Sequence, residues 1–257
     1  MTTKNYGTRL PGMPRQRLTG RLIVVEGADG SGRSTEVGLL REWLEIQGHA
    51  VVDTGLRRST LLSEQIDEAK RGHTLGAATM ALFYAADFAD QLENKMIPSL
   101  AAGSTVLADR YIYTLMARAI VRGASRDWAQ RLYGFALQPD LVLFLDARPE
   151  ILLHRAIAKY GSLDYWESGM DLSLSRDRFE SFFRYQDLLR KEFEWMASPY
   201  KFHVVDANRS PLLVHTDVRK IVQPLYVRGT ASESLEPEPP ARPAVSARRR
   251  APSAASA

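Results

Sequence analysis

Residues 22–35, with the sequence LIVVEGADGSGRST, constrain the fold of this 257-residue chain more than any other segment. Four apolar residues predict a buried strand, a glycine-rich turn follows, and Val37, Leu40 and Leu44 then recur at helical spacing. The turn matches the pattern G-x-x-x-x-G-K-[ST], except that Arg33 replaces the lysine. In this order of elements, backbone N–H groups at the helix N-terminus bind phosphate. The segment therefore predicts a phosphate-binding loop, and a glycine-rich turn without a ligand is the alternative.

The predicted loop gives its side chains separate roles. Arg33 would contact the terminal phosphates of ATP, and the Ser34 hydroxyl would bind Mg²⁺. Because a guanidinium is a wide planar fork and an ammonium a compact charge, Arg33 is expected to preserve binding better than catalytic geometry. The residues expected to bind ATP and its phosphates are Gly27, Ala28, Asp29, Gly30, Ser31, Gly32, Arg33, Ser34 and Thr35.

Composition excludes several classes of function. The chain has no cysteine, which excludes disulfides, thiolate catalysis and cysteine-ligated zinc. No apolar run approaches the ~18 residues of a membrane span, and the N-terminus has no hydrophobic signal core, so we expect a cytoplasmic protein without a membrane partner. Four basic and no acidic residues lie in residues 1–20 of a chain with net charge +4. The basicity thus belongs to an end of the chain, and nucleic acid is not expected as a partner.

Three regions differ in composition. Residues 1–20 hold glycine, proline and basic residues without periodicity, and we expect a flexible basic arm. Residues 230–257 are rich in Pro, Ala and Arg and cannot bury enough apolar surface to fold, so we expect a disordered tail. Residues 21–229 between them form the predicted folded domain.

Short apolar runs alternate with amphipathic segments through the folded region. This alternation predicts an α/β fold with three layers, a five-stranded parallel sheet with helices on both faces. Ligands bind at the carboxyl edge of such a sheet. The predicted strands are residues 22–25, 50–52, 105–107, 141–145 and 202–205.

The sequence VLADRY at residues 106–111 is the second informative motif. Asp109 at the end of a buried strand would bind Mg²⁺ directly or through water. Arg110 beside it would bind phosphate, while the alternative for this Asp-Arg pair is a surface ion pair.

The ordered set of motifs resembles the thymidylate kinase family from about residue 21 to residue 227. The motifs that carry this resemblance are EGAD at residues 26–29, ALFYAAD at 81–87, ADRY at 108–111, QPDLVLFLD at 138–146 and HVVDA at 203–207. The resemblance implies in-line transfer of the ATP γ-phosphoryl group to a nucleoside monophosphate, with dTMP as the expected acceptor and Mg²⁺ as cofactor. It implies catalytic roles for Arg33, Arg110 and Arg155, of which Arg155 begins a mobile lid over ATP.

The resemblance also implies how the acceptor is bound. Asp29 would hydrogen-bond the 3′-hydroxyl of the acceptor sugar, Phe83 would stack on its base, and Arg110 would bind its phosphate. Phe83 as an ordinary core residue and Arg155 as a solvated cation are the alternatives. The family is commonly dimeric, and the apolar residues 75–102 would supply a homodimer interface or be buried within one subunit.

Two departures from the family concern the acceptor. Asp87 occupies the position expected for an arginine that binds the acceptor phosphate, and a carboxylate there would repel it. The family pattern Thr-Arg-Glu-Pro is absent after the second strand, where Arg57 or Arg58 would supply the missing cation. These departures leave a kinase for another acceptor as one alternative to dTMP phosphorylation. Arg33 and the few arginines of the lid leave a nucleotide-binding module with little turnover as the other.

Overall fold

The computed structural model describes residues 4–13 and 16–227. The chain divides into two units, Met1–Val222 and Gln223–Ala257, and the described part of the second contains the short helix α10, Pro224–Val227. The tail predicted for residues 230–257 lies outside the described residues.

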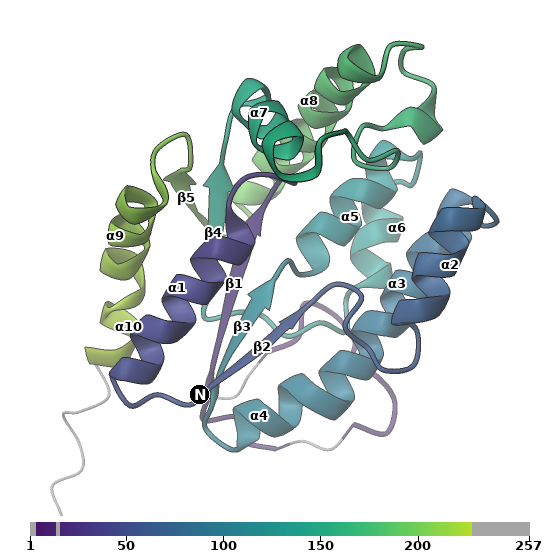
Figure 1. Ribbon diagram of the computed structural model, residues 1–257. Coiled ribbons are helices and arrows are strands. Elements are labelled where there is room, and N and C mark those ends of the chain that lie inside the picture. Colours follow the sequence, from purple (N-terminus) through teal and green to yellow (C-terminus); the bar gives the residue numbers. More distant parts are fainter. Residues whose placement is uncertain (1–3, 14–15, 228–257) are drawn as a thin grey trace, which may run out of the picture. The chain divides into compact units, whose positions relative to one another are not determined.

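A parallel sheet of five strands forms the centre of the first unit, as predicted (Figure 1). The strand order is β2-β3-β1-β4-β5, so the phosphate-loop strand β1 lies in the middle. β1 and β4 are almost entirely buried because helices cover both faces, which explains their continuous apolar sequences. The strands are β1 (Arg21–Gly27), β2 (Val51–Gly55), β3 (Thr105–Asp109), β4 (Leu141–Asp146) and β5 (Phe202–Asp206).

Helices cover both faces of this sheet (Figure 1). α1 and α9 pack against each other on one face, and α4, α5 and α8 contact the sheet on the other. No helix among residues 4–13 and 16–227 is long and apolar enough to cross a membrane. The helices of the first unit are α1 (Arg33–Ile46), α2 (Ser63–Gly72), α3 (Ala77–Gln91), η1 (Leu92–Met96), α4 (Ile97–Ala101), α5 (Ile112–Val121), α6 (Arg126–Leu132), α7 (Pro149–Tyr160), η2 (Met170–Leu172), α8 (Arg178–Ala197) and α9 (Pro211–Val222).

The register of the strands brings the functional loops together. Val25 of β1 pairs with Asp109 of β3, and Gly27 pairs with Leu145 of β4. Since all five strands run in the same direction, the loops after β1, β3 and β4 leave the sheet at one edge. That edge carries the glycine-rich turn and the Asp109-Arg110 pair.

The N-terminal arm differs from the prediction, because residues 4–13 are packed against the domain. Asn5 forms an antiparallel bridge with Leu137, and the Tyr6 hydroxyl hydrogen-bonds the Tyr113 hydroxyl at 2.7 Å. The Tyr6 ring also makes edge-to-face contacts with Tyr113 and with Tyr200 of the α8–β5 turn. One aromatic residue in a polar segment has no periodicity to reveal it, yet it orders the arm.

Replacing Tyr6 with alanine is therefore expected to destabilise the domain. The half-buried ring and its hydrogen bond should cost about 1–3 kcal/mol, and each kcal/mol lowers Tm by roughly 2–4 °C in a domain of this size. Thermal unfolding of Tyr6→Ala measures this, with exposed Thr8→Ala as the matched control. Equal Tm values for both variants would show that the arm contributes nothing.

Candidate functional site

The turn between β1 and α1 has the backbone of a phosphate-binding loop. Gly32 caps α1 with φ 97°, a left-handed conformation that favours glycine, and no side chain caps the helix. The first N–H groups of α1 are thus left for a ligand. A Cβ on Gly27 would lie 2.8 Å from the Leu145 carbonyl oxygen, while one on Gly32 would meet no atom within 4 Å. Gly27 therefore fits against the sheet, and the space beside Gly32 is open to phosphate.

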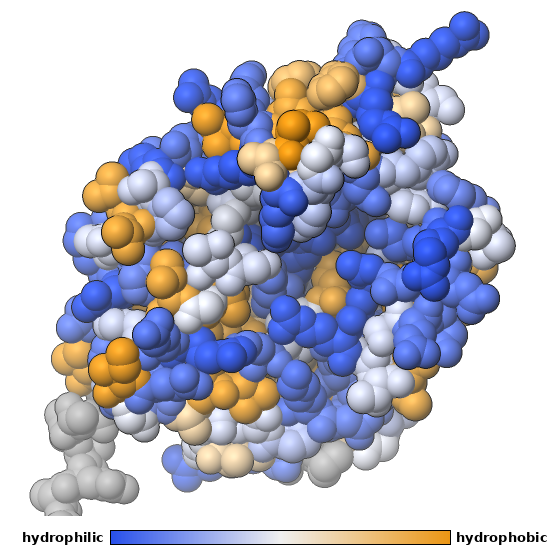
Figure 2. All heavy atoms as spheres, in the orientation of Figure 1, coloured by the Kyte–Doolittle hydropathy of each residue, from blue (hydrophilic) through white to orange (hydrophobic). Residues whose placement is uncertain are grey.

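A polar cavity of about 490 Å³ opens beside this loop. Figure 2 shows the molecule hollowed near the centre of this face, with hydrophilic surface around the hollow. Cations outnumber carboxylates in the lining, so the cavity attracts anions. The cations are Arg33, Arg57, Arg58, Arg110, Arg118, Arg155 and Lys159, and the carboxylates are Asp29, Asp109 and Glu167.

Ser34 and Asp109, the two predicted metal ligands, meet at the wall of this cavity. The Ser34 hydroxyl donates to Asp109 Oδ2 at 2.8 Å, and Arg33 Nε donates to Asp109 Oδ1 at 3.0 Å. Burial would raise the pKa of Asp109, but Arg33 and the Ser34 hydrogen bond hold it below its ordinary value. A hydroxyl beside an ionised carboxylate is an oxygen pair of the kind that binds Mg²⁺ together with phosphates.

Arg33 lies folded against its own loop. Besides Asp109 it donates to the carbonyl oxygens of Gly27 and Ala28, and its side chain is almost entirely buried. Its guanidinium thus contacts the wall of the cavity and does not extend across the cavity.

Asp29 collects three arginines around one carboxylate. Arg110 donates to Oδ1, Arg118 donates to Oδ2 at 2.9 Å, and Arg33 Nη2 lies 3.6 Å from Oδ1. Burial would raise the pKa of Asp29, but Arg110, Arg118 and Arg33 together lower it well below its ordinary range. The Asp29 carboxylate is therefore ionised and partly neutralises the cluster.

Glu26 fixes the conformation that aims Arg110 at Asp29. It is fully buried, accepts from the Tyr111 and Thr114 N–H groups at 2.8 and 3.2 Å, and accepts from the Thr114 hydroxyl at 2.6 Å. Arg110 turns into the site with φ 72°. Burial, then the nearby Arg33, lowers the pKa of Arg110 to about 10, so the group stays charged at neutral pH. Its buried Nε has no hydrogen-bond partner among the described residues.

Arg155 of α7 reaches the loop from the other side. Its guanidinium donates to the carbonyl oxygens of Gly30 and Ser31, both at 3.3 Å, and of Ala207 at 3.0 Å. It thus connects α7, the phosphate loop and the segment after β5. A further cavity of about 180 Å³ beside it is lined by Gly32, Thr35, Arg155, Ala207, Arg209 and other residues.

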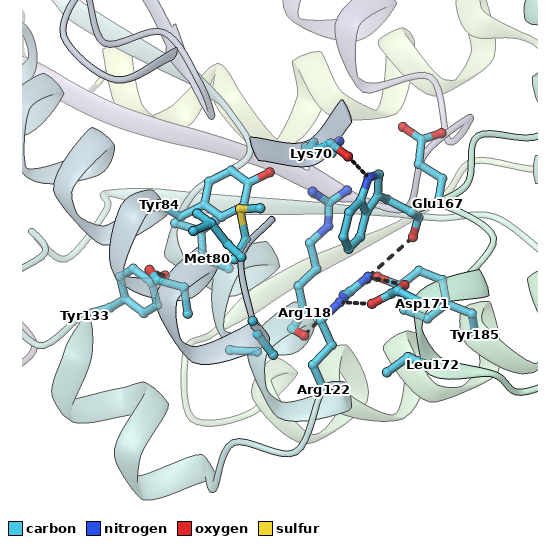
Figure 3. A pocket seen from close by; sticks show the side chains of 17 residues that line it. Lys70, Met80, Tyr84, Arg118, Arg122, Tyr133, Glu167, Asp171, Leu172 and Tyr185 are labelled. Atoms are coloured by element: carbon cyan, nitrogen blue, oxygen red, sulfur yellow. Dashed lines mark hydrogen bonds and ion pairs between the residues drawn. The ribbon is translucent and has the colours of Figure 1, made fainter. Parts of the chain in front are cut away.

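An apolar cavity of about 370 Å³ lies beside the polar one. Arg118 and Glu167 line both cavities. Tyr84 and Met80 of α3 form one wall (Figure 3). Phe83, which was expected to stack on the acceptor base, lines neither cavity and packs on the core. Residue 83 is one position from Tyr84, so its side chain leaves α3 in a direction about 100° around the helix axis from that of Tyr84.

Asp87, the second residue of α3 expected to contact the acceptor, lies outside both cavities. It is 1% exposed. Its carboxylate accepts from the N–H groups of Arg57 at 3.0 Å and Ser59 at 3.1 Å, and from the Gln91 amide at 2.9 Å. Burial raises its pKa and these hydrogen bonds oppose the rise. The Asp87 carboxyl group is thus turned to the loop after β2.

The segment after α7 covers the apolar cavity and touches α2. Trp166 Nε1 donates to the Lys70 carbonyl oxygen at 3.2 Å, and the Trp166 ring stacks on His73 with centroids 5.2 Å apart. Trp166 and Lys70 both line the apolar cavity. Glu167 follows, and burial, then the charge of Asp29, raises its pKa.

Known proteins resemble this chain over most of its length. A family model described as thymidylate kinase matches residues 25–218. The probable thymidylate kinase 2 of Saccharolobus solfataricus is 34% identical over 206 residues, which are 80% of this chain and 96% of that protein. The thymidylate kinase of Jannaschia sp. is 34% identical over 212 residues, 78% and 94% of the two chains. The chain belongs to the thymidylate kinase family. The resemblance inferred from the motifs is thus confirmed.

Three lining residues of this thymidylate kinase family member were missed in the sequence. Tyr84 lies one position beyond Phe83, the residue that the family resemblance predicts to stack on the acceptor base. Arg118 carries the only charge in the α5 sequence IYTLMARAIV, and this lone cation on an apolar helix was an available signal. Lys70 sits at the end of a strongly charged helix, where nothing in the sequence distinguishes it from its exposed neighbours.

Changing Gly32 to valine is expected to weaken ATP binding about tenfold or more. A β-branched residue in a left-handed conformation costs roughly 1–2 kcal/mol, and its side chain would enter the space left for phosphate. Titration calorimetry with Mg–ATP measures the change. Gly38→Val, in the exposed middle of α1, is the control. Unchanged ATP affinity in Gly32→Val would contradict the assignment of the loop.

Changing Asp109 to asparagine is expected to raise the Mg²⁺ concentration that gives half-maximal turnover by about tenfold. The amide keeps the shape but removes the charge that binds a hard cation. Steady-state rates across a Mg²⁺ titration provide the test, with Asp127→Asn on the exposed face of α6 as control. An unaltered Mg²⁺ requirement would leave Asp109 as a structural partner of Arg33.

Proposed function

We propose that this chain transfers the γ-phosphoryl group of ATP to dTMP. One observation carries the proposal: an apolar cavity lies beside a cation-rich cavity at a phosphate-binding loop, and Arg118 and Glu167 line both. A nucleotide base fits the first and phosphates fit the second. The names of the relatives supply the identity of the acceptor.

The donor would lie along the loop. Its phosphates would take the free N–H groups at the start of α1, and its base would extend toward the 180 Å³ cavity beside Arg155. Ser34 and Asp109 would hold Mg²⁺, which neutralises charge on the phosphates when bound. Arg33 would leave the loop carbonyls to meet the terminal phosphate.

The acceptor would enter from the apolar cavity. Its base would lie against Tyr84, and a phosphate oxygen would attack the γ-phosphorus as the bond to the ADP oxygen breaks. Arg110, which lines the polar cavity, would bind the transferring group, and Asp29 would accept from the sugar hydroxyl. The reaction then needs positioning and charge neutralisation but no covalent enzyme intermediate.

A panel of nucleoside monophosphates with ATP and Mg²⁺ tests the proposal. We expect dTMP to give the highest kcat/KM and equal amounts of ADP and dTDP. ADP and the diphosphate product are quantified separately by ion-exchange chromatography, with a reaction lacking acceptor as the control. If another monophosphate gave the highest kcat/KM, that compound would be assigned as the acceptor in place of dTMP. ATP binding without product from any of them would identify a nucleotide-binding module.

The homodimer and the cytoplasmic location stay predictions. On α3, Leu82 is 51% exposed, so one subunit does not bury all the apolar side chains of this helix.

A further inference from the structure

Arg118 of α5 and Arg122 at the C-cap of this helix, four residues on, differ in how many of their donors form hydrogen bonds. Arg122 donates through Nε and Nη2 to Asp171 at 2.7 and 3.1 Å, and through Nη1 to the Tyr185 hydroxyl at 2.9 Å. Arg118 makes one side-chain hydrogen bond among the described residues, from Nη2 to Asp29. In Figure 3 both side chains run in the same direction from α5, and Arg118 extends beyond the Arg122–Asp171 pair. Arg122 is a structural residue, whereas Arg118 has donors to spare.

We propose that Arg118 binds the phosphate of the acceptor nucleotide. It would take the place of the arginine that the family resemblance leads one to expect at position 87 of α3. The proposal rests on the function proposed above and names the residue that recognises the acceptor. Arg118 lines both cavities, and the acceptor phosphate must lie where the two meet, between its own base and the donor phosphates.

The charges around Arg118 fit an anion at this point. Lys70 lines the apolar cavity beside it, and the carboxylates of Asp164 and Glu167 only partly offset what lowers its pKa. Burial, then the charge of Arg118, lowers the pKa of Lys70, so an anion between these two cations would relieve the repulsion between them. On α3, the residues at the apolar cavity, Ala77, Met80, Ala81 and Tyr84, carry no charge.

Asp29 shows what kind of ligand Arg118 accepts. Its two oxygens receive Arg110 and Arg118 separately, so one anionic group bridges the two guanidinium groups. A phosphate has three oxygens at comparable spacing and a larger charge. It can therefore take the same two donors while Asp29 turns to the sugar hydroxyl.

Comparing dTMP with thymidine isolates the phosphate contact. Calorimetry on the full chain measures both affinities in the wild type, Arg118→Gln, Arg118→Lys and the control Arg126→Gln, whose side chain pairs with Glu192 on the surface. We expect Arg118→Gln to weaken dTMP binding about 10- to 100-fold with thymidine binding unchanged. Arg118→Lys should recover part of this loss, and Arg126→Gln should lose nothing. The KM for ATP should stay the same in all variants.

Each other outcome overturns the proposal. Equal losses for dTMP and thymidine would mean that Arg118 shapes the sugar or base site, and a higher KM for ATP would place it with the donor. Thermal unfolding checks that the variants fold. If Arg118→Gln does not fold, the comparison uses Arg118→Lys, which keeps the positive charge beside Asp29.

Failure of the proposed function gives a different result. If the wild type ignores dTMP but binds another monophosphate, that compound and its nucleoside replace dTMP and thymidine in the same comparison. If the wild type binds ATP but none of the monophosphates, the kinase function and this proposal both fall.

Discussion

The arrangement of the site depends on the carboxylate of Asp29, the counter-charge that three arginines share. Arg33, Arg110 and Arg118 converge in a partly buried cleft, and three guanidinium groups there would repel each other strongly without a counter-charge. The Asp29 carboxylate, with its depressed pKa, partly compensates all three, and Asp109 also pairs with Arg33. Removing a partner from such a cluster leaves charge unpaired, which costs more than the contact itself contributes. The site is therefore organised before any nucleotide arrives.

Two further carboxylates organise the loops around that cluster by a different means. Glu26 and Asp87 are almost fully buried, and each accepts hydrogen bonds from backbone N–H groups of a neighbouring loop. Each converts an irregular segment into a fixed one, because an unpaired buried N–H is costly. Glu26 sets the entry to α5 and so the direction of Arg110. Asp87 sets the loop after β2, which places Arg57 and Arg58 at the rim of the polar cavity.

The parts that could be predicted from the sequence are those governed by local pattern. Continuous apolar runs located all five strands, and the spacing of glycines located the loop, because these signals need no knowledge of partners. The meeting of Ser34 and Asp109 followed from parallel strands ending at one edge. To predict which α3 side chains face the cavity, the rotation of the helix must be known to within one position. The periodicity of a mostly apolar segment does not supply this. Tyr6 and Arg118 act through contacts more than 80 residues away in the chain, which no local pattern records.

The contact of Trp166 with α2 would couple any movement of the segment after α7 to any movement of α2. The segment that follows α7 is fastened to the carbonyl of Lys70 and to the ring of His73, at the end of the helix beside the apolar cavity. If this segment opened over the phosphate loop, this contact would have to break, and a shift of α2 would break it as well. By thermodynamic linkage, a nucleotide that ordered one side would then strengthen binding on the other by the same factor. Closure of both sides would also exclude water and so protect the γ-phosphoryl group from hydrolysis.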